Sequence, residues 1–331
     1  MISIEKMKRI FNSVNDRGYE ATARIENLTH NTVSDYIRRY KQYMNETVLS
    51  DNPTITLFDI ETDFMKNATW GLWKQNIHIG QILESWSMIC WAAEDLLTGE
   101  KNSGAVTPEE SLLRNDEAIT FKLWNLMDKS DVIIAHNLLK FDRKKMNTCF
   151  LKYGLGQPSP YQMIDTLQIA RSNFSFPSNK LDYLAQELGH PMKHDTGFKL
   201  WRECDGVDAI EETEIMTMGD KIIKTTTYNK NIIETAIEKM DLYCQNDVSV
   251  LKNVYLDIRG WDKRHPNLAG YGESNDGKCC ICRSTNLVPA TTDYRTPVSV
   301  YKTYTCQNCG THNHSRFAEK RSKQLLRGCA R

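Results

Sequence analysis

Apolar residues along the chain follow two spacings, which together predict an α/β fold. Runs rich in β-branched and bulky residues at 54–63, 82–93 and 131–137 have the length of strands. Helical spacing dominates elsewhere, most extensively over 231–258, where one apolar stripe continues along the whole segment. We therefore expect a mixed sheet flanked by helices.

The first 48 residues have a helical pattern of their own. Apolar residues recur at helical spacing up to Gly18, and two more short helices follow. Helices joined by short turns are typical of a helix-turn-helix, and residues 32–39 resemble the recognition helices of phage and mobile-element helix-turn-helix domains. We expect residues 1–48 to bind DNA, with Arg38 and Arg39 among the contacts. A three-helix module that docks on a protein would have the same pattern.

Two segments interrupt the pattern of the body. Residues 68–75 form a loop with Trp70 and Trp73. Aromatic side chains in a loop either pack on the sheet or stack on bases, at roughly 1–3 kcal/mol per base. Trp73 is therefore a candidate substrate contact. Residues 203–228 are expected to form a hairpin that turns at 219–220, as an arm over substrate or an inert elaboration.

Two carboxylates end the first strand. Side chains of a strand alternate between its faces, so Asp59 and Glu61 share one face. Neighbouring acids repel, and their burial is costly unless a cation lies between them. A divalent metal suits paired carboxylates, and open α/β sheets bind ligands at the carboxyl ends of their strands. This stretch alone fits equally well a strand that ends in two hydrated acids.

A further acid lies where an apolar residue is expected. Asp247 falls within the apolar stripe of the long helix, and Tyr243 precedes it by one turn. A buried aspartate is costly unless it is paired or metal-bound. Asp142 lies near the N-terminus of a helix that starts close behind the polar strand end at 136–137, where the helix dipole alone would favour a carboxylate. Asp165 is expected to cap a helix and not to be a ligand.

The cysteines predict a second metal site. Of ten cysteines, five lie close together near the C-terminus, and two Cys-x-x-Cys pairs flank a segment of strand character. This pattern is typical of a zinc ribbon with one structural Zn²⁺ and no open coordination position. We expect the ribbon at 278–315 and a basic tail at 316–331, while Cys280, His312 or His314 could replace one ligand. The expected ligands are Cys279, Cys282, Cys306 and Cys309.

Charge is balanced over the chain but unevenly distributed. Lys+Arg and Asp+Glu both number 42, yet residues 261–331 carry 12 basic and 5 acidic side chains. The acidic body with basic ends fits a metal-binding core flanked by modules for a polyanion. The charged N-terminus and the lack of a long apolar run predict neither a signal peptide nor a membrane span. We therefore expect a cytoplasmic protein.

Three motifs occur in order within residues 54–259. They are Phe58-Asp-Ile-Glu-Thr62, His136-Asn-Leu-Leu-Lys-Phe-Asp142 and Tyr243-Cys-Gln-Asn-Asp247. They resemble the three motifs of DEDD 3′–5′ exonucleases. The Tyr-x-x-x-Asp form resembles the DEDDy subgroup, which includes the proofreading domains of family B DNA polymerases and stand-alone phage exonucleases. The resemblance implies a ribonuclease-H-like fold for 54–259, from which the 203–228 region and the flanking modules depart.

The resemblance also implies roles for the acids. Two divalent ions roughly 3.5–4 Å apart supply an activated water, neutralised phosphate charge and a stabilised leaving 3′-oxyanion. By resemblance, these ions are Mg²⁺ or Mn²⁺. Asp59 bridges both, Glu61 and Asp247 complete the nucleophile-side ion, and Asp142 supports the second ion through water.

By the same resemblance, Tyr243 orients the attacking water, since a phenol pKa near 10 argues against a free base. Asn137 and Phe141 would face the terminal nucleotide. The implied activity is hydrolysis of DNA from a single-stranded 3′ end, with release of nucleoside 5′-monophosphates. A replication or repair polymerase is a candidate partner, and a phage-encoded protein would act in the host cytoplasm.

Three alternatives remain at this point. An exoribonuclease is the closest rival, because the motifs do not distinguish sugars. A ribonuclease-H-like transposase or integrase also carries such flanking modules, but typically has one Asp on the first strand and a late Glu on a helix. The Asp-x-Glu pair in one strand disfavours that layout. A non-catalytic regulator is disfavoured because all four acids are present.

Overall fold

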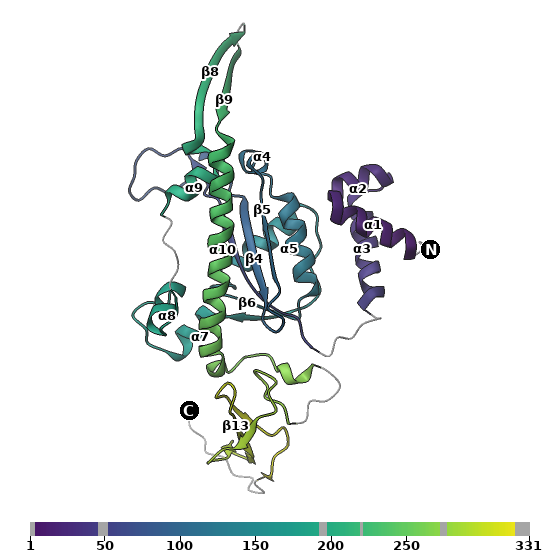
Figure 1. The fold of residues 1–331 in the computed structure, drawn as a ribbon, viewed down its shortest axis with the longest axis vertical. Coiled ribbons are helices and arrows are strands. Elements are labelled where there is room, and N and C mark those ends of the chain that lie inside the picture. Colours follow the sequence, from purple (N-terminus) through teal and green to yellow (C-terminus); the bar gives the residue numbers. More distant parts are fainter. Residues whose placement is uncertain (1–3, 46–51, 192–196, 219–220, 272–276, 322–331) are drawn as a thin grey trace.

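The computed structural model describes residues 4–45, 52–191, 197–218, 221–271 and 277–321, and a five-stranded mixed sheet lies at its centre (Figure 1). The strand order is β5-β4-β1-β6-β7, with β1 antiparallel to β4 and parallel to β6. The predicted mixed α/β sheet is thus confirmed, and this order fits a ribonuclease-H-like fold. The strands are β1 (Ile55–Thr62), β4 (Met88–Asp95), β5 (Lys101–Ala105), β6 (Val132–Ala135) and β7 (Gln162–Asp165).

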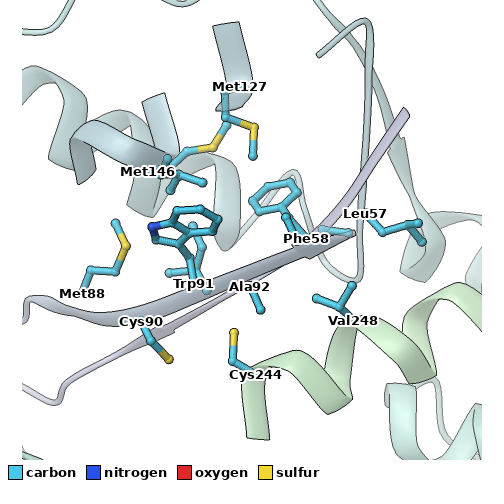
Figure 2. Close-up of a cluster of buried hydrophobic side chains, with 14 of the residues drawn as sticks. Leu57, Phe58, Met88, Cys90, Trp91, Ala92, Met127, Met146, Cys244 and Val248 are labelled. Atoms are coloured by element: carbon cyan, nitrogen blue, oxygen red, sulfur yellow. The ribbon is translucent and has the colours of Figure 1, made fainter. Parts of the chain in front are cut away.

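Helices cover both faces of the sheet. Phe58 of β1 points towards Met127 of α5 (Glu117–Lys129) and Met146 of α6 (Asp142–Lys152), whereas Leu57 points to the opposite side (Figure 2). That opposite side is covered by α10 (Lys230–Ile258), whose Val248 lies beneath the strand (Figure 2). A strand buried on both faces must be apolar at successive positions, which explains the continuous run at the start of β1.

The long helix α10 crosses the sheet as a single element of 29 residues. Its N-terminus is capped by Asn229, whose side chain accepts a hydrogen bond from Ile232 N. The predicted apolar stripe is confirmed, and Asp247 is buried within it. No helix of the described ranges, α10 included, has the length and apolar content to cross a membrane. The remaining helices are α4 (Pro108–Leu112), α7 (Thr166–Asn173), α8 (Leu181–Glu187) and α9 (Lys199–Cys204), with short helices η1 (Ile79–Gln81), η2 (Val207–Ala209), η3 (Arg259–Trp261) and η4 (Leu268–Gly270).

The N-terminal segment forms the expected helical module. Gly18, at a φ of 82°, separates the first two helices, because this left-handed conformation favours glycine. The module packs on the body through Tyr19, whose ring centroid lies 4.0 Å from that of Phe121 in α5. The three helices therefore share a continuous apolar core with the sheet. They are α1 (Ile4–Arg17), α2 (Tyr19–Glu26) and α3 (His30–Asn45).

The strand expected at 82–93 is divided in the structure. Its first part, β3 (Ile82–Glu84), pairs with β2 (Lys66–Asn67) in a separate ribbon. Glu84 of β3 binds Lys66 of β2 and Arg114, with N···O distances of 2.9 and 2.7 Å. These charged partners hold β3 away from the main sheet, which β4 joins only from Met88. These ion pairs join residues far apart in the sequence, so the apolar run at 82–93 gave no indication that the strand divides.

Two antiparallel elements extend from the body. The expected hairpin is present as β8 (Ile210–Met218) and β9 (Lys221–Tyr228), and it projects past the N-terminal end of α10 (Figure 1). Its turn at 219–220 lies outside the described residues. At the other end of α10, the C-terminal ribbon consists of short strands, and residues 322–331 of the expected tail are outside the described ranges. The ribbon strands are β10 (Leu287–Pro289), β11 (Tyr294–Arg295), β12 (Ser299–Tyr301), β13 (Thr303–Cys306), β14 (His312–His314) and β15 (Lys320–Arg321).

Candidate active site

Three predicted acids meet between β1 and α10. The register places Asp59 opposite Ala92 and Glu61 opposite Cys90 of β4, on the sheet face that α10 covers. Ala92 and Cys90 are small, so α10 can approach closely enough to bring Asp247 to this face. One carboxylate oxygen from each of the three acids lies within 4.8 Å of the others. Such a group of hard oxygen ligands is suited to a divalent metal ion.

The fourth predicted acid, Asp142, is buried beside this group. It is the first residue of α6, and among the described residues neither of its carboxylate oxygens has a hydrogen-bond partner. Burial and the nearby charge of Asp59 raise the pKa of Asp142 well above its ordinary value. A bound cation would reverse this effect by stabilising the ionised form. A buried carboxylate next to three others therefore fits a metal site.

Asp165 positions the chain that leads to Asp142. Its Oδ1 accepts hydrogen bonds from Leu167 N and Asn137 N at 3.0 Å, and its Oδ2 accepts one from Leu139 N at 3.1 Å. The first bond confirms the predicted cap of α7. The other two are a role that the sequence did not suggest, since they join the end of β7 to the turn after β6. They stabilise Asn137 at a φ of 72°, just before α6 begins.

His136, in the second motif, has a structural role. Its Nδ1 lies 2.9 Å from Thr166 Oγ1, and its Nε2 lies 2.9 Å from the carbonyl oxygen of Asn179. Both ring nitrogens are thus engaged within the protein. Phe141, at the N-terminus of α6, is partly exposed, and Lys145 Nζ lies 5.6 Å from the centre of its ring.

Trp201, which the sequence analysis missed, packs against Tyr243. The two ring centroids are 6.0 Å apart, and the ring planes meet at 76°. Trp201 belongs to α9, and Phe198 directly precedes that helix. The ring centroid of Phe198 lies 5.3 Å from that of Phe64, just after β1. Two aromatic contacts, one from α9 and one from the residue before it, therefore reach the tyrosine of the third motif and the chain that follows Asp59 and Glu61. This contact could not be read from local spacing because 42 residues separate its members in the sequence.

A buried thiol lies behind Asp59. Cys244 Sγ lies 3.4 Å from the carbonyl oxygen of Asp59 and 3.6 Å from its Oδ2. Burial and the neighbouring Cys90 raise the pKa of the Cys244 thiol well above its ordinary value. Cys244 is therefore a protonated donor to Asp59. Its place on the apolar stripe of α10, between Tyr243 and Asp247, was the sequence signal for this role.

An ion-pair network anchors the chain on either side of the site. Arg114 Nη1 lies 3.1 Å from Asp63, its Nη2 binds Asp205, and Lys66 Nζ lies 2.8 Å from Asp205. Burial and the adjacent Asp205 raise the pKa of Asp63 to about 7. The network joins the end of β1 to the β2–β3 ribbon and to the end of α9. It supports the base of the tryptophan loop, whose ends are closed by hydrogen bonds between Ala68 and Gln81.

The predicted substrate contacts differ in their surroundings. Trp70 and Trp73 are 97% and 84% exposed, so they do not pack on the sheet. In α3, Arg38 and Arg39 both form ion pairs with Asp35, the second at 2.8 Å. The tryptophans therefore lie open to a partner, whereas the charge of the two arginines is partly offset within their own helix.

The four predicted zinc ligands come together at one end of the ribbon. The Sγ atoms of Cys279 and Cys309 are 3.6 Å apart, as are those of Cys282 and Cys306, and all four lie within 4.8 Å of one another. Tetrahedral zinc with Zn–S bonds of about 2.3 Å requires S···S distances of roughly 3.8 Å.

Side-chain amides approach two of these sulfurs. Asn313 Nδ2 lies 3.5 Å from Cys279 Sγ, and Asn308 Nδ2 lies 3.6 Å from Cys282 Sγ, as is usual for thiolates that bind a metal. The alternative ligands are not part of this group. His312 Nδ1 bonds to Thr305, and His314 stacks on Tyr294. Cys280 is likewise outside the group of four.

Comparison with known proteins gives a structural likeness and no family assignment. No protein-family model matches the sequence, and no curated protein matches it. The structure is similar to that of the family B DNA polymerase from the hyperthermophilic archaeon Pyrobaculum calidifontis, at 12% sequence identity and a TM-score of 0.40. The similarity covers 62% of this chain but 25% of the polymerase, so the chain spans about a quarter of that protein's length. We therefore infer the activity from the side chains of the site.

Proposed function

We propose that the protein is a metal-dependent 3′–5′ exonuclease that hydrolyses DNA from its 3′ end and releases nucleoside 5′-monophosphates. The observation that best supports this activity is the set of four acids. Asp59, Glu61 and Asp247 lie within 4.8 Å of one another, and Asp142 is buried beside them without hydrogen-bond partners for its carboxylate oxygens among the described residues. Four acids without a cation would repel one another at this separation.

These acids would hold two Mg²⁺ or Mn²⁺ ions, which supply an activated water and neutralise phosphate charge when bound. Cys244 donates to Asp59 and keeps that carboxylate oriented towards α10. Asp165 stabilises the turn before α6, so that Asp142 is presented to the same site. Neither residue needs to contact substrate in order to act.

Other residues of the chain would bind the reacting strand. Tyr243 would orient the attacking water, as its position one turn before Asp247 allows, and Trp201 would hold its ring in place. Asn137 and Phe141 would contact the terminal nucleotide. Trp73 would stack on a base further along the strand, for which its exposure is suited.

The flanking segments would have separate tasks around a catalytic body at 54–259. Residues 1–48 would bind DNA through Arg38 and Arg39. These side chains would leave their ion pairs with Asp35 and bind phosphate groups instead. Residues 278–315 would form a ribbon held by one structural Zn²⁺, with the basic segment 316–331 after it. A polymerase of replication or repair is the partner that such an exonuclease would serve.

The test uses 5′-labelled single-stranded DNA, duplex DNA and RNA, each incubated with Mg²⁺ or with EDTA. We expect DNA ladders that shorten from the 3′ end, with no ladder in EDTA. Because EDTA also removes zinc, the Asp59→Ala variant is the matched control, and it should be inactive with its zinc retained. Internal cleavage or strand-transfer products would overturn the proposal, and activity confined to RNA would identify an exoribonuclease instead.

A further inference from the structure

The C-terminal ribbon presents one sheet face that no metal ligand occupies. The ribbon has two three-stranded sheets, β11-β12-β15 and β10-β13-β14, and their central strands β12 and β13 follow one another in the chain with Lys302 between them. Residues directly opposite in antiparallel strands point to the same face. The register pairs Tyr294 with Tyr301, Thr303 with His314, and Ser299 with Arg321. Ser299, Tyr301 and Thr303 are alternate residues along β12 and β13, and the contacts of His314 with Tyr294 and Tyr301 bring the two sheets together on one face, which we call the aromatic face.

Three rings of the aromatic face are in contact with one another. The rings of Tyr294 and His314 are stacked, with centroids 4.8 Å apart and an interplanar angle of 16°. Tyr301 lies 5.3 Å from His314 and 6.0 Å from Tyr294. Tyr294 is 49% exposed, and His314 and Arg321 are also exposed. The three rings thus form one cluster, of which Tyr294 and His314 are open to solvent.

The ribbon that carries the aromatic face has a net positive charge. Residues 278–321 carry 7 basic and 2 acidic side chains. One of the two acids, Glu319, is paired with Lys302 at 3.1 Å. Arg321 lies on the aromatic face itself, while Arg295 and Lys320 project from the same strands on the opposite face. This charge fits a polyanion, and the rings fit a partner that has flat faces of its own.

We propose that the aromatic face binds single-stranded nucleic acid, with bases stacked on Tyr294 and His314 and phosphates bound by Arg321. A duplex would gain little from these rings, because its bases are already stacked on one another. The surface would bind the substrate strand apart from the four acids and hold it near the enzyme between successive cleavages. At the other end of the ribbon, a zinc ion bound by the four cysteines would hold the end of β13, through Cys306, against the turn at Cys279–Cys282.

Binding is measured on the full, zinc-loaded chain that carries Asp59→Ala, so that the probe survives. The probes are a labelled oligothymidine of about 20 nucleotides, the matching oligouridine, and a duplex of the same length. Tyr294→Ala should weaken binding of both single strands at least about five-fold, whereas Tyr294→Phe should bind them as the parent does. Duplex binding should be the same in all three proteins. Arg321→Ala should reduce the slope of log K against log salt by about 0.7 for the single strands.

Zinc content is measured for each variant. If Tyr294→Ala retains zinc and binds oligothymidine as tightly as the parent, the aromatic face does not stack on bases. Equal losses in Tyr294→Ala and Tyr294→Phe would also overturn the proposal. If Tyr294→Ala loses zinc, the Arg321→Ala variant provides the test instead. An unchanged salt slope in that variant would refute binding of single strands at the aromatic face. Because only binding is measured, a chain that binds single strands but cleaves none would refute the exonuclease and leave this surface standing.

Discussion

The indole of Trp201 meets the ring of Tyr243 nearly edge-on, with 6.0 Å between the ring centroids. This pair fixes α9 against the part of α10 that carries Tyr243 and Asp247. Edge-to-face aromatic pairs contribute about 0.5–1.5 kcal/mol beyond the area that they bury. The contact with Trp201 thus restricts the rotation of the partly buried Tyr243 ring.

We expect Trp201→Ala to lower the rate of the chemical step by up to about ten-fold, while Trp201→Phe retains most of the rate. The reason is that Trp201 acts through Tyr243. In a Tyr243→Phe background, Trp201→Ala should then cause no further loss of rate, although it still lowers stability. Single-turnover hydrolysis and urea unfolding of the four proteins measure both effects. Additive rate losses would show that Trp201 has a separate role.

Asp142→Asn should separate stability from activity. Replacing this buried acid, whose carboxylate oxygens have no hydrogen-bond partner within the described ranges, by a neutral amide removes the repulsion from Asp59, so the metal-free protein should be at least as stable as the parent. Hydrolysis should fall by about a hundred-fold or more, which corresponds to ~2.7 kcal/mol of barrier. Thermal unfolding without divalent ions and DNA cleavage with Mg²⁺ measure the two effects. A clear loss of stability without metal would mean that Asp142 is a structural acid.

Asp116 should contribute to the loss of stability in acid. Its Oδ2 accepts a hydrogen bond from Met88 N at 2.8 Å, and Lys152 Nζ lies 3.1 Å from its Oδ1. Burial alone would raise the pKa of Asp116, but hydrogen bonds from Tyr153 and Met88 and the charge of Lys152 hold that pKa below its ordinary value. The carboxylate therefore stabilises the fold above a pH of about 4, and this contribution is lost as the pH falls through the lowered pKa.

Asp116→Asn should accordingly cost about 1–3 kcal/mol at neutral pH. The free energy of unfolding of the variant should decline less steeply than that of the parent as the pH falls below about 4. Urea unfolding at neutral pH and at a series of acid pH values provides the comparison. Parallel curves for the two proteins would exclude Asp116 as a source of the acid sensitivity.

Replacing Cys282 should release zinc, whereas replacing the nearby Cys280 should not. Cys282→Ser removes a thiolate from the group of four, so metal content and the thermal stability of the ribbon should fall. Cys280→Ser is the matched control, since Cys280 is outside that group, and it should retain the metal. Hydrolysis of a chromogenic nucleotide phosphodiester should continue in both variants because the acids lie elsewhere. Loss of zinc from Cys280→Ser would mean that the ligand set differs from the one described.

The tryptophan loop should matter for long substrates and not for short ones. We expect Trp73→Ala to lower kcat/KM for single-stranded DNA by about five-fold to a hundred-fold, in line with one lost base stack. The chromogenic phosphodiester, which has no neighbouring bases, should be cleaved at the parental rate. Trp261→Ala, which changes an exposed tryptophan outside the loop, is the control. A uniform loss on both substrates would point to misfolding of the loop.

The local sequence pattern was sufficient to identify the acids of the site. Alternation along β1 placed Asp59 and Glu61 on one face, and the apolar stripe of α10 marked Asp247 as buried, because strand and helix periodicities are properties of neighbouring residues. Spacing of the cysteines likewise gave the group of four. These features need no knowledge of the tertiary structure.

Long-range contacts were not accessible in this way. Arg114 binds Asp63 and Asp205, which lie far from it in both directions along the chain, and no periodicity links the three. The same network holds β3 out of the main sheet, so the strand expected at 82–93 divides. Asp165 was correctly expected as a cap, yet its bonds to the turn at 137–139 depend on β6 and β7 being neighbours.

The length of α10 has a consequence for how this chain can vary. At 1.5 Å per residue, its 29 residues make a rod of about 43 Å, with the hairpin at one end and the ribbon packed near Gly260 at the other. Each inserted or deleted residue would turn everything beyond it by about 100°. A single deletion after Asp247 would thus swing the face that meets the ribbon away from Thr311, while the acids stayed in place. Sequences of this architecture should therefore tolerate length changes in loops and hairpins, and conserve the residue count of this helix.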